Sequence, residues 1–381
     1  MFMKIVIAID SFKGSLSTFE AGSAASEGIR NICKDAEIIV SPLADGGEGT
    51  VNAIIEARNG KMRTLCVRGP LGDPVQASYG IIEESNTAVL EMASACGLPL
   101  IPEDKRNPLF TSTYGFGEMI ADAIKVGCRN FIIGIGGSAT NDGGIGMLQA
   151  LGFDLTDKNG SPIAWGAIGL KDLADIKTEN RLKTLDDCHF SVACDVTNPL
   201  CGNLGCSAVF APQKGAAAHD IVCMDDWLSR YAALTKQKAN PLADPSYPGC
   251  GAAGGLGFAF LSYLNAELRS GIDLVIEKTG LEAHIKDADI VITGEGRLDG
   301  QSSMGKAPVG VAKLAKKYQK PVIAVAGSVT EEAHLTHAYG IDAYFSILKS
   351  PCSLNEAMDK HHAYCNLKHT VEQIFRLLQL R

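Results

Sequence analysis

The feature that most constrains this sequence is a glycine-rich segment at residues 134–144, directly after a short apolar run. The run Phe131–Ile133 is typical of a buried strand, and Ile145–Leu151 has the apolar spacing of a helix. A loop between a strand and a helix start presents free N–H groups, and the helix dipole adds partial positive charge there. Glycine also lets the backbone approach an anion closely. The segment therefore predicts a phosphate-binding loop, with a simple strand-to-helix turn as the alternative.

Two strand–helix units lie upstream of this loop. The first strand is predicted at Lys4–Ile9 and ends at Asp10. The second is predicted at Glu37–Leu43 and ends just before Asp45. A helical pattern follows each strand, which is typical of a parallel, doubly wound sheet. In such sheets the ligands bind at the carboxyl ends of the strands, where these charged residues lie.

The pattern changes in the middle of the chain, where short alternating strands predominate, and it returns near the end. The returning elements are strands at 289–293, 321–326 and 344–348, a helix at 309–318 and a final helix at 354–380. We therefore predict an α/β protein with a discontinuous, three-layer, Rossmann-like domain built from residues 1–65 and 285–381. A second α/β domain is inserted at 66–284 and carries the glycine-rich loop. A length of 381 residues suits two domains, and we expect the active site in the cleft between them.

Composition narrows the classes of partner. The net charge is −8, which argues against nucleic acid or an anionic membrane surface as a partner. No apolar run approaches the ~20 residues that span a bilayer. We expect a cytoplasmic protein that binds small molecules, and the sequence leaves a homo-oligomer open.

The 12 cysteines do not indicate a metal site. No Cys-x-x-Cys pair occurs, and the nearest pair, Cys201 and Cys206, has no further ligand at zinc spacing. We expect reduced thiols that behave as small apolar side chains.

Charged residues follow the first two strands. Lys13 is expected to neutralise charge on a phosphate or carboxylate, and Asp10 to hold a metal or orient Lys13. Ser11 adds a hydroxyl group beside them. Asp45 and Glu48 lie among glycines, where carboxylates suit Mg²⁺ or substrate hydroxyl groups. The alternative for both segments is an ordinary capped turn.

Two further cationic residues lie in the C-terminal part. Arg297, in a loop expected after the strand at 289–293, can bind a carboxylate with two parallel hydrogen bonds. Residues 300–307 resemble a Walker A loop, but Ala307 occupies the Ser/Thr position and no strand precedes the segment, so a true P-loop is rejected. Lys306 remains a candidate phosphate contact before a helix start.

Asp195 follows a strand expected at 190–193 and is a candidate base or metal ligand. The alternative is an Asx turn set up by Asn198-Pro199. A weaker signal is the spacing Gly134-x-Gly136-x-x-Ala139 with Asp154 downstream, which fits a loose dinucleotide fingerprint.

Six segments in order along the chain carry a more specific signal. They are 10–13, 44–50, 134–144, 194–200, 251–257 and 294–299. With these segments the chain resembles the bacterial glycerate kinase family of the type that makes 2-phosphoglycerate. The resemblance implies a two-domain α/β fold, ATP, Mg²⁺ and D-glycerate. Ile9 departs from the family, in which proline is common before the first Asp-Ser, but this removes no functional group.

We therefore expect an ATP-dependent kinase that phosphorylates D-glycerate on its 2-hydroxyl group by in-line transfer. The catalytic residues would be Asp195, Lys13 and Asp10, with Asp195 and Asp142 as metal ligands. The residues expected to bind ATP are Gly136, Gly137, Ser138, Thr140, Asn141 and Lys306. The residues expected to bind glycerate are Arg297, Asp45, Glu48 and Ser11. The alternatives are an NAD(P)-dependent oxidoreductase of a small hydroxy acid and a non-catalytic protein that binds phosphorylated metabolites.

Overall fold

The computed structural model describes residues 3–380 and divides into two compact units. Unit 1 consists of Met1–Asp45, Asn52–Arg58 and Ile272–Arg381, and unit 2 consists of Gly46–Val51 and Asn59–Gly271. The boundaries expected from the sequence, near residues 65 and 285, lie 7 residues after Arg58 and 13 residues after Ile272. The short excursion of Gly46–Val51 into unit 2 has no counterpart in the sequence-based division. Both units combine a sheet with helices, so the predicted α/β class is confirmed.

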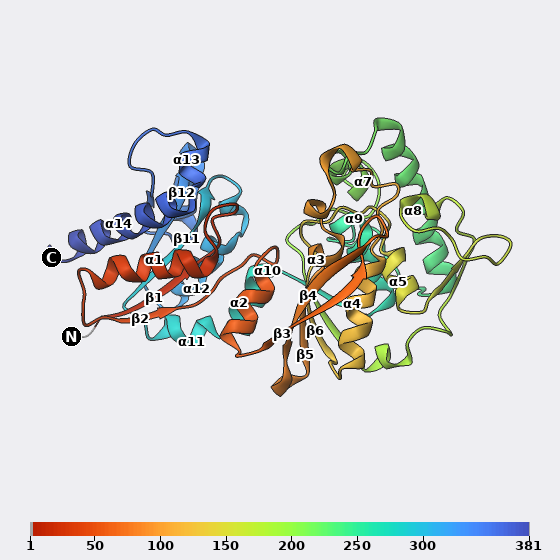
Figure 1. Cartoon of the computed structure of the whole chain (residues 1–381), viewed down its shortest axis with the longest axis horizontal. Coiled ribbons are helices and arrows are strands. Elements are labelled where there is room, and N and C mark those ends of the chain that lie inside the picture. Colours follow the sequence, from red (N-terminus) through yellow and green to blue (C-terminus); the bar gives the residue numbers. More distant parts are fainter. Residues whose placement is uncertain (1–2, 381) are drawn as a thin grey trace. The chain divides into compact units, whose positions relative to one another are not determined.

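Unit 1 is built on a five-stranded, entirely parallel sheet in the order β13-β12-β11-β1-β2. Its strands are β1 (Lys4–Ile9), β2 (Glu37–Val40), β11 (Ile290–Leu298), β12 (Val322–Val329) and β13 (Ala343–Ser346). β1 pairs with β11, and Ile5 lies opposite Ile290. The first and last parts of the chain therefore form one sheet, as the red and blue elements of Figure 1 show.

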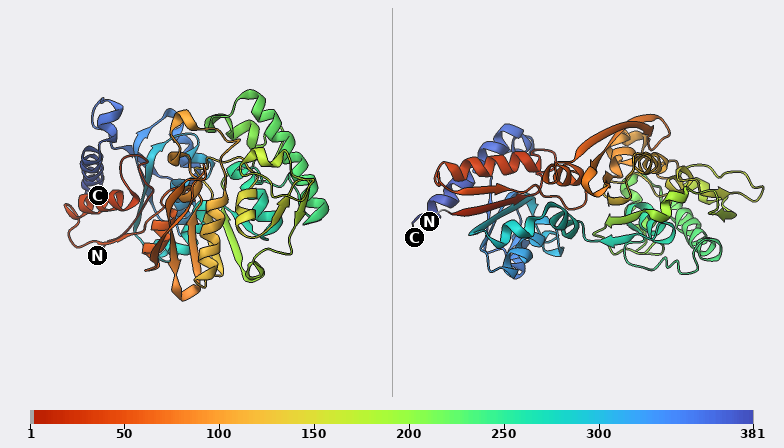
Figure 2. Two further views of the ribbon diagram at one scale, coloured as in Figure 1. Left: turned by 45° about the vertical axis from the view of Figure 1, so that its right-hand side comes forward. Right: turned by 90° about the horizontal axis from the view of Figure 1, so that it is seen from below.

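Helices cover both faces of this sheet (Figure 2). α1 (Thr18–Arg30) and α14 (Lys360–Leu378) pack together on one face, and α12 (Ala307–Lys317) contacts β1 and β11 from the other. Ile5, Ile7 and Ile9 occupy every second position of β1 and therefore lie on the same face of the sheet. All three belong to the core that includes α1 and α14. A Cβ on Gly28 would lie 2.3 Å from the carbonyl oxygen of Lys368, so the two helices approach each other at a glycine.

The C-terminal helix differs from the sequence-based expectation. One helix was expected at residues 354–380, and the structure has α13 (Leu354–Met358) followed by α14. Asp359 causes the break because its backbone is non-helical and its carboxylate accepts a hydrogen bond from the amide of His362 (2.9 Å). Asp359 is therefore an N-cap, a position that aspartate favours over a helix interior.

Unit 2 is built on a six-stranded mixed sheet in the order β10-β9-β6-β5-β4-β3. β3, β4 and β5 pair antiparallel, whereas β5, β6, β9 and β10 run parallel. The strands are β3 (Lys61–Arg68), β4 (Pro74–Ile82), β5 (Thr87–Glu91), β6 (Asn130–Gly134), β9 (His189–Ala193) and β10 (Glu267–Arg269). A separate two-stranded sheet is formed by β7 (Asp154–Thr156) and β8 (Asp175–Lys177).

The register of the parallel strands positions the loops of unit 2. Gly134 at the end of β6 lies opposite Glu91 of β5 and Ala193 of β9. The loops that follow these three strands therefore leave the same edge of the sheet. The remaining helices of the chain are α2 (Thr50–Ala57), α3 (Ala93–Cys96), α4 (Tyr114–Lys125), α5 (Ile145–Ala150), α6 (Ala167–Leu170), α7 (Cys206–Phe210), α8 (Ala218–Lys238), α9 (Ala252–Tyr263), α10 (Gly271–Thr279) and α11 (Leu281–Lys286).

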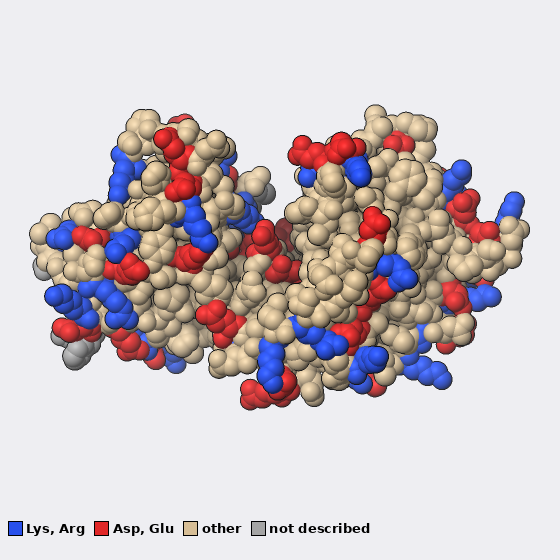
Figure 3. Space-filling view, in the orientation of Figure 1, with Lys and Arg blue, Asp and Glu red and all other residues tan. Residues whose placement is uncertain are grey.

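No helix within residues 3–380 has both the length and the apolar character needed to cross a bilayer. On the face shown in Figure 3, lysine and arginine side chains are interspersed with aspartate and glutamate.

Candidate active site

The predicted site residues fall into two groups, one in each unit. In unit 1, Asp10 follows β1 and Asp45 follows β2, and these strands are neighbours in the parallel sheet. The Nζ atom of Lys13 lies 3.4 Å from Oδ2 of Asp45. The amide of Ser11 donates a hydrogen bond to Oδ1 of Asp10 (2.7 Å), which holds this carboxylate at the strand end. The predicted group of Asp10, Ser11, Lys13 and Asp45 is thus assembled on one sheet edge.

Asp10 is a buried carboxylate whose negative charge is only partly balanced by nearby positive charge. Only 4% of it is exposed. Burial raises the pKa of Asp10 to about 7, and the negative charge of Asp45 adds to that rise. The pKa of Lys13 lies above its usual value, because the charges of Asp45 and Asp10 outweigh the opposing effect of partial burial. The group therefore holds more negative charge than its lysine neutralises.

Glu295 is a third carboxylate in this group that sequence reasoning missed. It lies on β11, next to β1, and is 8% exposed. It accepts a hydrogen bond from Oγ of Ser302. Burial raises the pKa of Glu295 to about 6, although the bond from Ser302 and the charge of Lys306 act in the opposite direction. The sequence offered one indication of Glu295, because it belongs to the segment 294–299. In that segment, only Arg297 was predicted to be a site residue.

Arg297 and Lys306, the other two predicted cations, both belong to unit 1. The expected loop position of Arg297 is wrong, because β11 continues to Leu298 and includes it. The arginine is largely exposed, and its Nε atom lies 3.4 Å from Oδ2 of Asp299. Lys306 is the residue directly before α12, and its Nζ atom donates to Oε1 of Gln301 (3.2 Å).

In unit 2, the exposed part of the glycine-rich loop is Gly136 and Gly137. Within the described part of the chain, the amides of these two residues make no backbone hydrogen bond. A Cβ on Gly134 would lie 2.5 Å from the carbonyl oxygen of Gly46, and one on Gly136 would lie 3.3 Å from Cα of Gly47. The loop at residues 46–50 therefore crosses the start of the 134–144 loop at positions where only glycine fits. Exposed amides without acceptors are what an anion site requires.

The second half of the loop is buried. Thr140, Asn141 and Asp142 have no exposed surface, so the direct contact with ATP expected for Thr140 and Asn141 does not fit their placement. Asp142 accepts hydrogen bonds from the amides of Thr113, Gly144 and Gly146 and from Oγ1 of Thr113. These bonds occupy its oxygens, which favours a structural role over the expected metal ligation. They also cover the start of α5, a helix of only 6 residues, so the structure adds no support for the expected helix-dipole contribution.

The segment 251–257 supports this buried half. Ala253, Gly254 and Gly255 all have positive φ values, of 51°, 67° and 91°. A Cβ on Gly254 would lie 2.2 Å from the carbonyl oxygen of Thr140. The glycines of this motif therefore serve close backbone packing against the 134–144 loop.

Lys214 is a second residue that sequence reasoning missed. It lies in a 3₁₀ turn at Pro212–Lys214 and is 3% exposed. Its Nζ atom donates to Oγ of Ser138 (2.8 Å) and to the carbonyl oxygen of Thr140 (2.7 Å). Burial lowers the pKa of Lys214 to about 8, against the smaller opposing influences of Cys206 and Asp142. A lysine between two small-residue segments offered no pattern from which to predict this position.

Asp195 and Glu48 complete the predicted group of unit 2, and both are exposed. Oδ1 of Asp195 accepts a hydrogen bond from the amide of Gly271 (2.9 Å). Glu91, which was not predicted, accepts one from the amide of Val51 (2.9 Å) and so anchors the loop that carries Glu48. Burial, with a contribution from the charge of Glu48, raises the pKa of Glu91.

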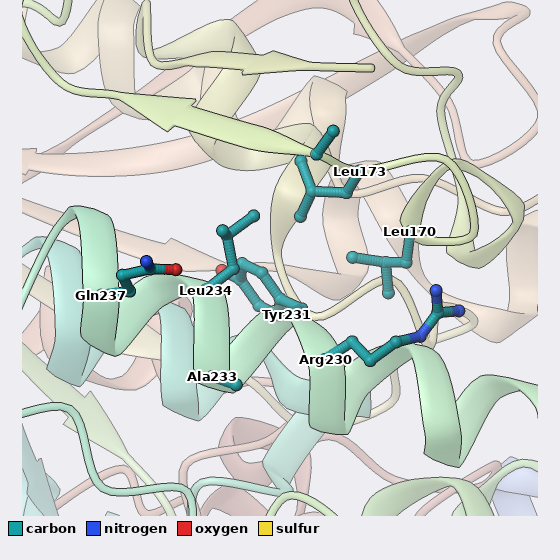
Figure 4. A pocket seen from close by; sticks show the side chains of 8 residues that line it. Leu170, Leu173, Arg230, Tyr231, Ala233, Leu234 and Gln237 are labelled. Carbon is teal, nitrogen blue, oxygen red and sulfur yellow. The ribbon is translucent and has the colours of Figure 1, made fainter. Parts of the chain in front are cut away.

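Two other features of unit 2 lie apart from these residues. Asp154, expected to bind a ribose in the dinucleotide alternative, begins β7 in the separate small sheet and accepts a hydrogen bond from Asn180 (2.7 Å). It therefore does not follow a strand of the main sheet, as that alternative requires. A hollow of about 300 Å³ lies beside α8 (Figure 4). It is lined by Leu170, Leu173, Ala174, Arg230, Tyr231, Ala233, Leu234 and Gln237, none of which belongs to the predicted site.

Comparison with known proteins bears on the resemblance directly. The model of the glycerate kinase family matches residues 5–379. The chain is 52% identical to the glycerate 2-kinase of Escherichia coli K12 over 365 residues, which is 96% of this chain and 95% of that protein. It is 47% identical to the glycerate kinase of Bacillus subtilis 168, covering 99% of this chain and 98% of that protein. A crystal structure from Salmonella typhimurium LT2, provisionally assigned as glycerate kinase 2, superposes with a TM-score of 0.90 at 47% identity, covering 100% of this chain and 99% of that one. Sequence and structure agree that the chain belongs to the glycerate kinase family.

Proposed function

We propose that this protein transfers the γ-phosphoryl group of ATP to the 2-hydroxyl group of D-glycerate, which yields ADP and 2-phosphoglycerate. Family membership over residues 5–379 carries the proposal, and the name of the Escherichia coli relative supports the 2-position. Neither the dinucleotide alternative nor a non-catalytic role gains support, because Asp154 lies outside the main sheet and the relatives are named as kinases.

The phosphates of ATP bind to the exposed amides of Gly136 and Gly137 and to the hydroxyl group of Ser138. Phosphoryl transfer depends mainly on positioning and on neutralising the charge of the transferred group. Lys13 and Lys306 supply positive charge, and Asp195 accepts the proton of the glycerate hydroxyl group.

The charged group of unit 1 binds glycerate and the cation. Arg297 binds the carboxylate of glycerate, and Ser11 and Asp45 contact its hydroxyl groups. Glu48, which lies in unit 2, is assigned to the same hydroxyl groups from the sequence. Within residues 3–380 no three His, Cys, Asp or Glu side chains form a ready-made metal site. Mg²⁺ needs fewer protein ligands, because it keeps several waters and shares phosphate oxygens. The neighbouring carboxylates of Asp10 and Asp45 fit this requirement, and a bound Mg²⁺ would neutralise charge on the transferred phosphoryl group. The interdomain cleft expected from the sequence stays a prediction.

A coupled assay of ADP release with D-glycerate and ATP tests the proposal, followed by phosphorus NMR of the product. Release of ADP that depends on D-glycerate, with 2-phosphoglycerate as product, is the expected result. No ADP release above the rate with ATP alone would contradict kinase activity. Formation of 3-phosphoglycerate would contradict only the position. A fluorescence titration with NADPH and NADH, in which no binding is expected, tests the oxidoreductase alternative.

A further inference from the structure

Lys214 is held in place by the chain around it. The 3₁₀ turn that contains it ends at Gly215, which has a φ of 91°. A Cβ on Gly215 would lie 2.2 Å from the carbonyl oxygen of Arg106, so the turn is pressed against a neighbouring loop. The ammonium group is therefore presented to Ser138 and Thr140 from a fixed position, where it makes its two hydrogen bonds.

The ammonium group has no ion-pair partner in the described part of the chain. Its two hydrogen-bond acceptors are the neutral hydroxyl oxygen of Ser138 and a backbone carbonyl oxygen. Burying an ammonium group without a counter-charge is costly. The charge of Asp142 opposes the effect of burial only in part, and within the described part of the chain the two residues form no ion pair. The Cys206 thiol stays neutral, because burial raises its pKa to about 12. A buried cation bonded to the same loop as two exposed amides that make no backbone hydrogen bond is suited to binding an anion.

We propose that Lys214 is a positioning residue for the phosphates of ATP, which acts by fixing and polarising the hydroxyl group of Ser138 as a hydrogen-bond donor. Oγ of Ser138 accepts a hydrogen bond from Lys214, so the hydrogen of that hydroxyl group remains available to donate to a phosphate oxygen. A donor that is itself bonded to a cation makes a stronger bond to an anion. This inference rests on the proposed function, because it takes the nucleotide as the ligand of the loop.

The alternative explanation is purely structural. Lys214 would stabilise the 134–144 loop through its two hydrogen bonds and would have no effect on nucleotide binding. The two explanations differ in what a variant changes. A structural tie affects folding and both substrates alike. A residue that acts through Ser138 weakens nucleotide binding selectively, and its effect disappears when the Ser138 hydroxyl group is absent.

The experiment measures ADP binding to the full chain by isothermal titration calorimetry in the presence of Mg²⁺. The variants are Lys214→Met, Ser138→Ala and the double variant, with Lys236→Met as the control, because Lys236 is an exposed lysine of α8 in the same unit. Lys214→Gln, which keeps an N–H donor but no charge, serves as the second variant if Lys214→Met does not fold. We expect Lys214→Met to weaken ADP binding by about tenfold or more, the usual scale for a charge-assisted hydrogen bond. The KM for D-glycerate should change by less than about twofold, and Lys236→Met should bind ADP like the wild type.

The double variant decides whether the two residues act together. Coupled residues give a double variant that binds ADP about as weakly as the weaker single variant. Fully additive losses, or wild-type affinity in Lys214→Met, overturn the inference and leave the proposed function intact. Parallel losses for ADP and D-glycerate with a lowered melting temperature also overturn it, in favour of the structural tie. A wild-type chain that neither binds nor releases ADP overturns the proposed function itself.

Discussion

The two groups of site residues differ in the sign of the charge that each leaves uncompensated. In unit 1, Asp10 and Glu295 are buried carboxylates whose pKa values are raised, to about 7 and about 6. In unit 2, Lys214 is a buried ammonium group whose pKa is lowered to about 8. Each shift has burial as its largest cause, so each group would gain from a ligand of opposite charge. The comparison supports the proposal of a cation bound at the carboxylates of unit 1 and of an anion bound at the Gly136–Ser138 loop beside Lys214, although unit 2 also carries the carboxylates of Glu48, Glu91 and Asp195.

The groups also differ in how they are built. Unit 1 presents side chains at the ends of adjacent parallel strands, whereas unit 2 presents backbone amides of a loop that glycines allow to pack closely. Replacing a side chain in unit 1 should therefore change chemistry more than stability. Adding a single methyl group in unit 2 should do the reverse.

The largest effect is expected when the exposed cation of the unit 1 group is removed. Lys13→Met should lower kcat by about 100- to 1,000-fold, the scale for losing one positioned charge-stabilising group. The melting temperature should change little, because the lysine side chain is 61% exposed and its pair with Asp45 is a surface pair. Steady-state kinetics and differential scanning calorimetry measure the two quantities. Lys34→Met, at an exposed lysine of the same unit, is the control. A near-normal kcat in Lys13→Met would remove Lys13 from the mechanism.

The opposite pattern is expected for Gly254→Ala in unit 2. The new Cβ would lie 2.2 Å from the carbonyl oxygen of Thr140, and the residue would have to keep a φ of 67°. We expect a loss of about 3 kcal/mol in the free energy of unfolding, from strain and forced backbone movement together. Urea denaturation measures the loss. Gly160→Ala is the matched control, since Gly160 has a φ of 79° but open space around it, and it should lose only about 1 kcal/mol. Equal losses would show that the close packing of segment 251–257 does not matter.

The sequence predicted the parts of the fold that depend on local apolar patterns better than the parts that depend on contacts between distant residues. Strand–helix alternation predicted β1 and β6 to within one residue, because buried parallel strands are continuous apolar runs, whereas β12 extends three residues beyond the predicted end. It failed where one polar residue changed the outcome, as Asp359 does in splitting the last helix. The excursion of Gly46–Val51 into unit 2 was also invisible, since it depends on packing against distant glycines rather than on local propensity.

The site was predictable where side chains mark strand ends, and less so where burial decides. Asp10, Lys13 and Asp45 follow strands in the sequence, and the structure assembles them. Thr140 and Asp142 have equally suitable chemistry, but neither has exposed surface, and the segment 251–257 packs against Thr140. Lys214 lies 70 or more residues from the loop it contacts, as its hydrogen bonds to Ser138 and Thr140 span 76 and 74 positions. Contacts of that separation leave no local pattern.

A smaller effect, on stability and its dependence on pH, is expected for Asp10→Asn. The folded-state pKa of Asp10 is about 7, above the value of 3.8 expected in the unfolded chain. Between these values the folded state holds a proton that the unfolded state has lost, so this group lowers the free energy of unfolding as pH rises from about 4 to about 7. Asparagine can still accept the hydrogen bond from the amide of Ser11 and carries no charge. The free energy of unfolding of Asp10→Asn, relative to that of the wild type, should increase by about 2 kcal/mol between pH 5 and pH 7 and then level off.

Thermal unfolding of both proteins from pH 5 to pH 8 measures this difference, with Asp35→Asn at an exposed position as the control. Added Mg²⁺ sharpens the test, because a cation bound at Asp10 and Asp45 should raise the melting temperature of the wild type and not that of Asp10→Asn. A difference independent of pH would contradict the raised pKa. Equal stabilisation of both proteins by Mg²⁺ would place the cation elsewhere.

The smallest effect is expected at Arg297, the most exposed of the predicted contacts in unit 1. Arg297→Lys keeps the positive charge but loses the second of two parallel hydrogen bonds to the carboxylate of glycerate. We expect the KM for D-glycerate to rise about fivefold, or about 1 kcal/mol, with kcat and the KM for ATP nearly unchanged. Arg376→Lys is the matched control, because Arg376 is a similarly exposed, ion-paired arginine of the same unit, at 57% against 65% exposure of the side chain. An unchanged KM for D-glycerate would leave Arg297 as a partner of Asp299 only and assign the carboxylate of the substrate to another cation. A rise in the KM for ATP instead would assign Arg297 to the phosphates. Nucleotide binding would then involve residues of unit 1 as well as the glycine-rich loop of unit 2.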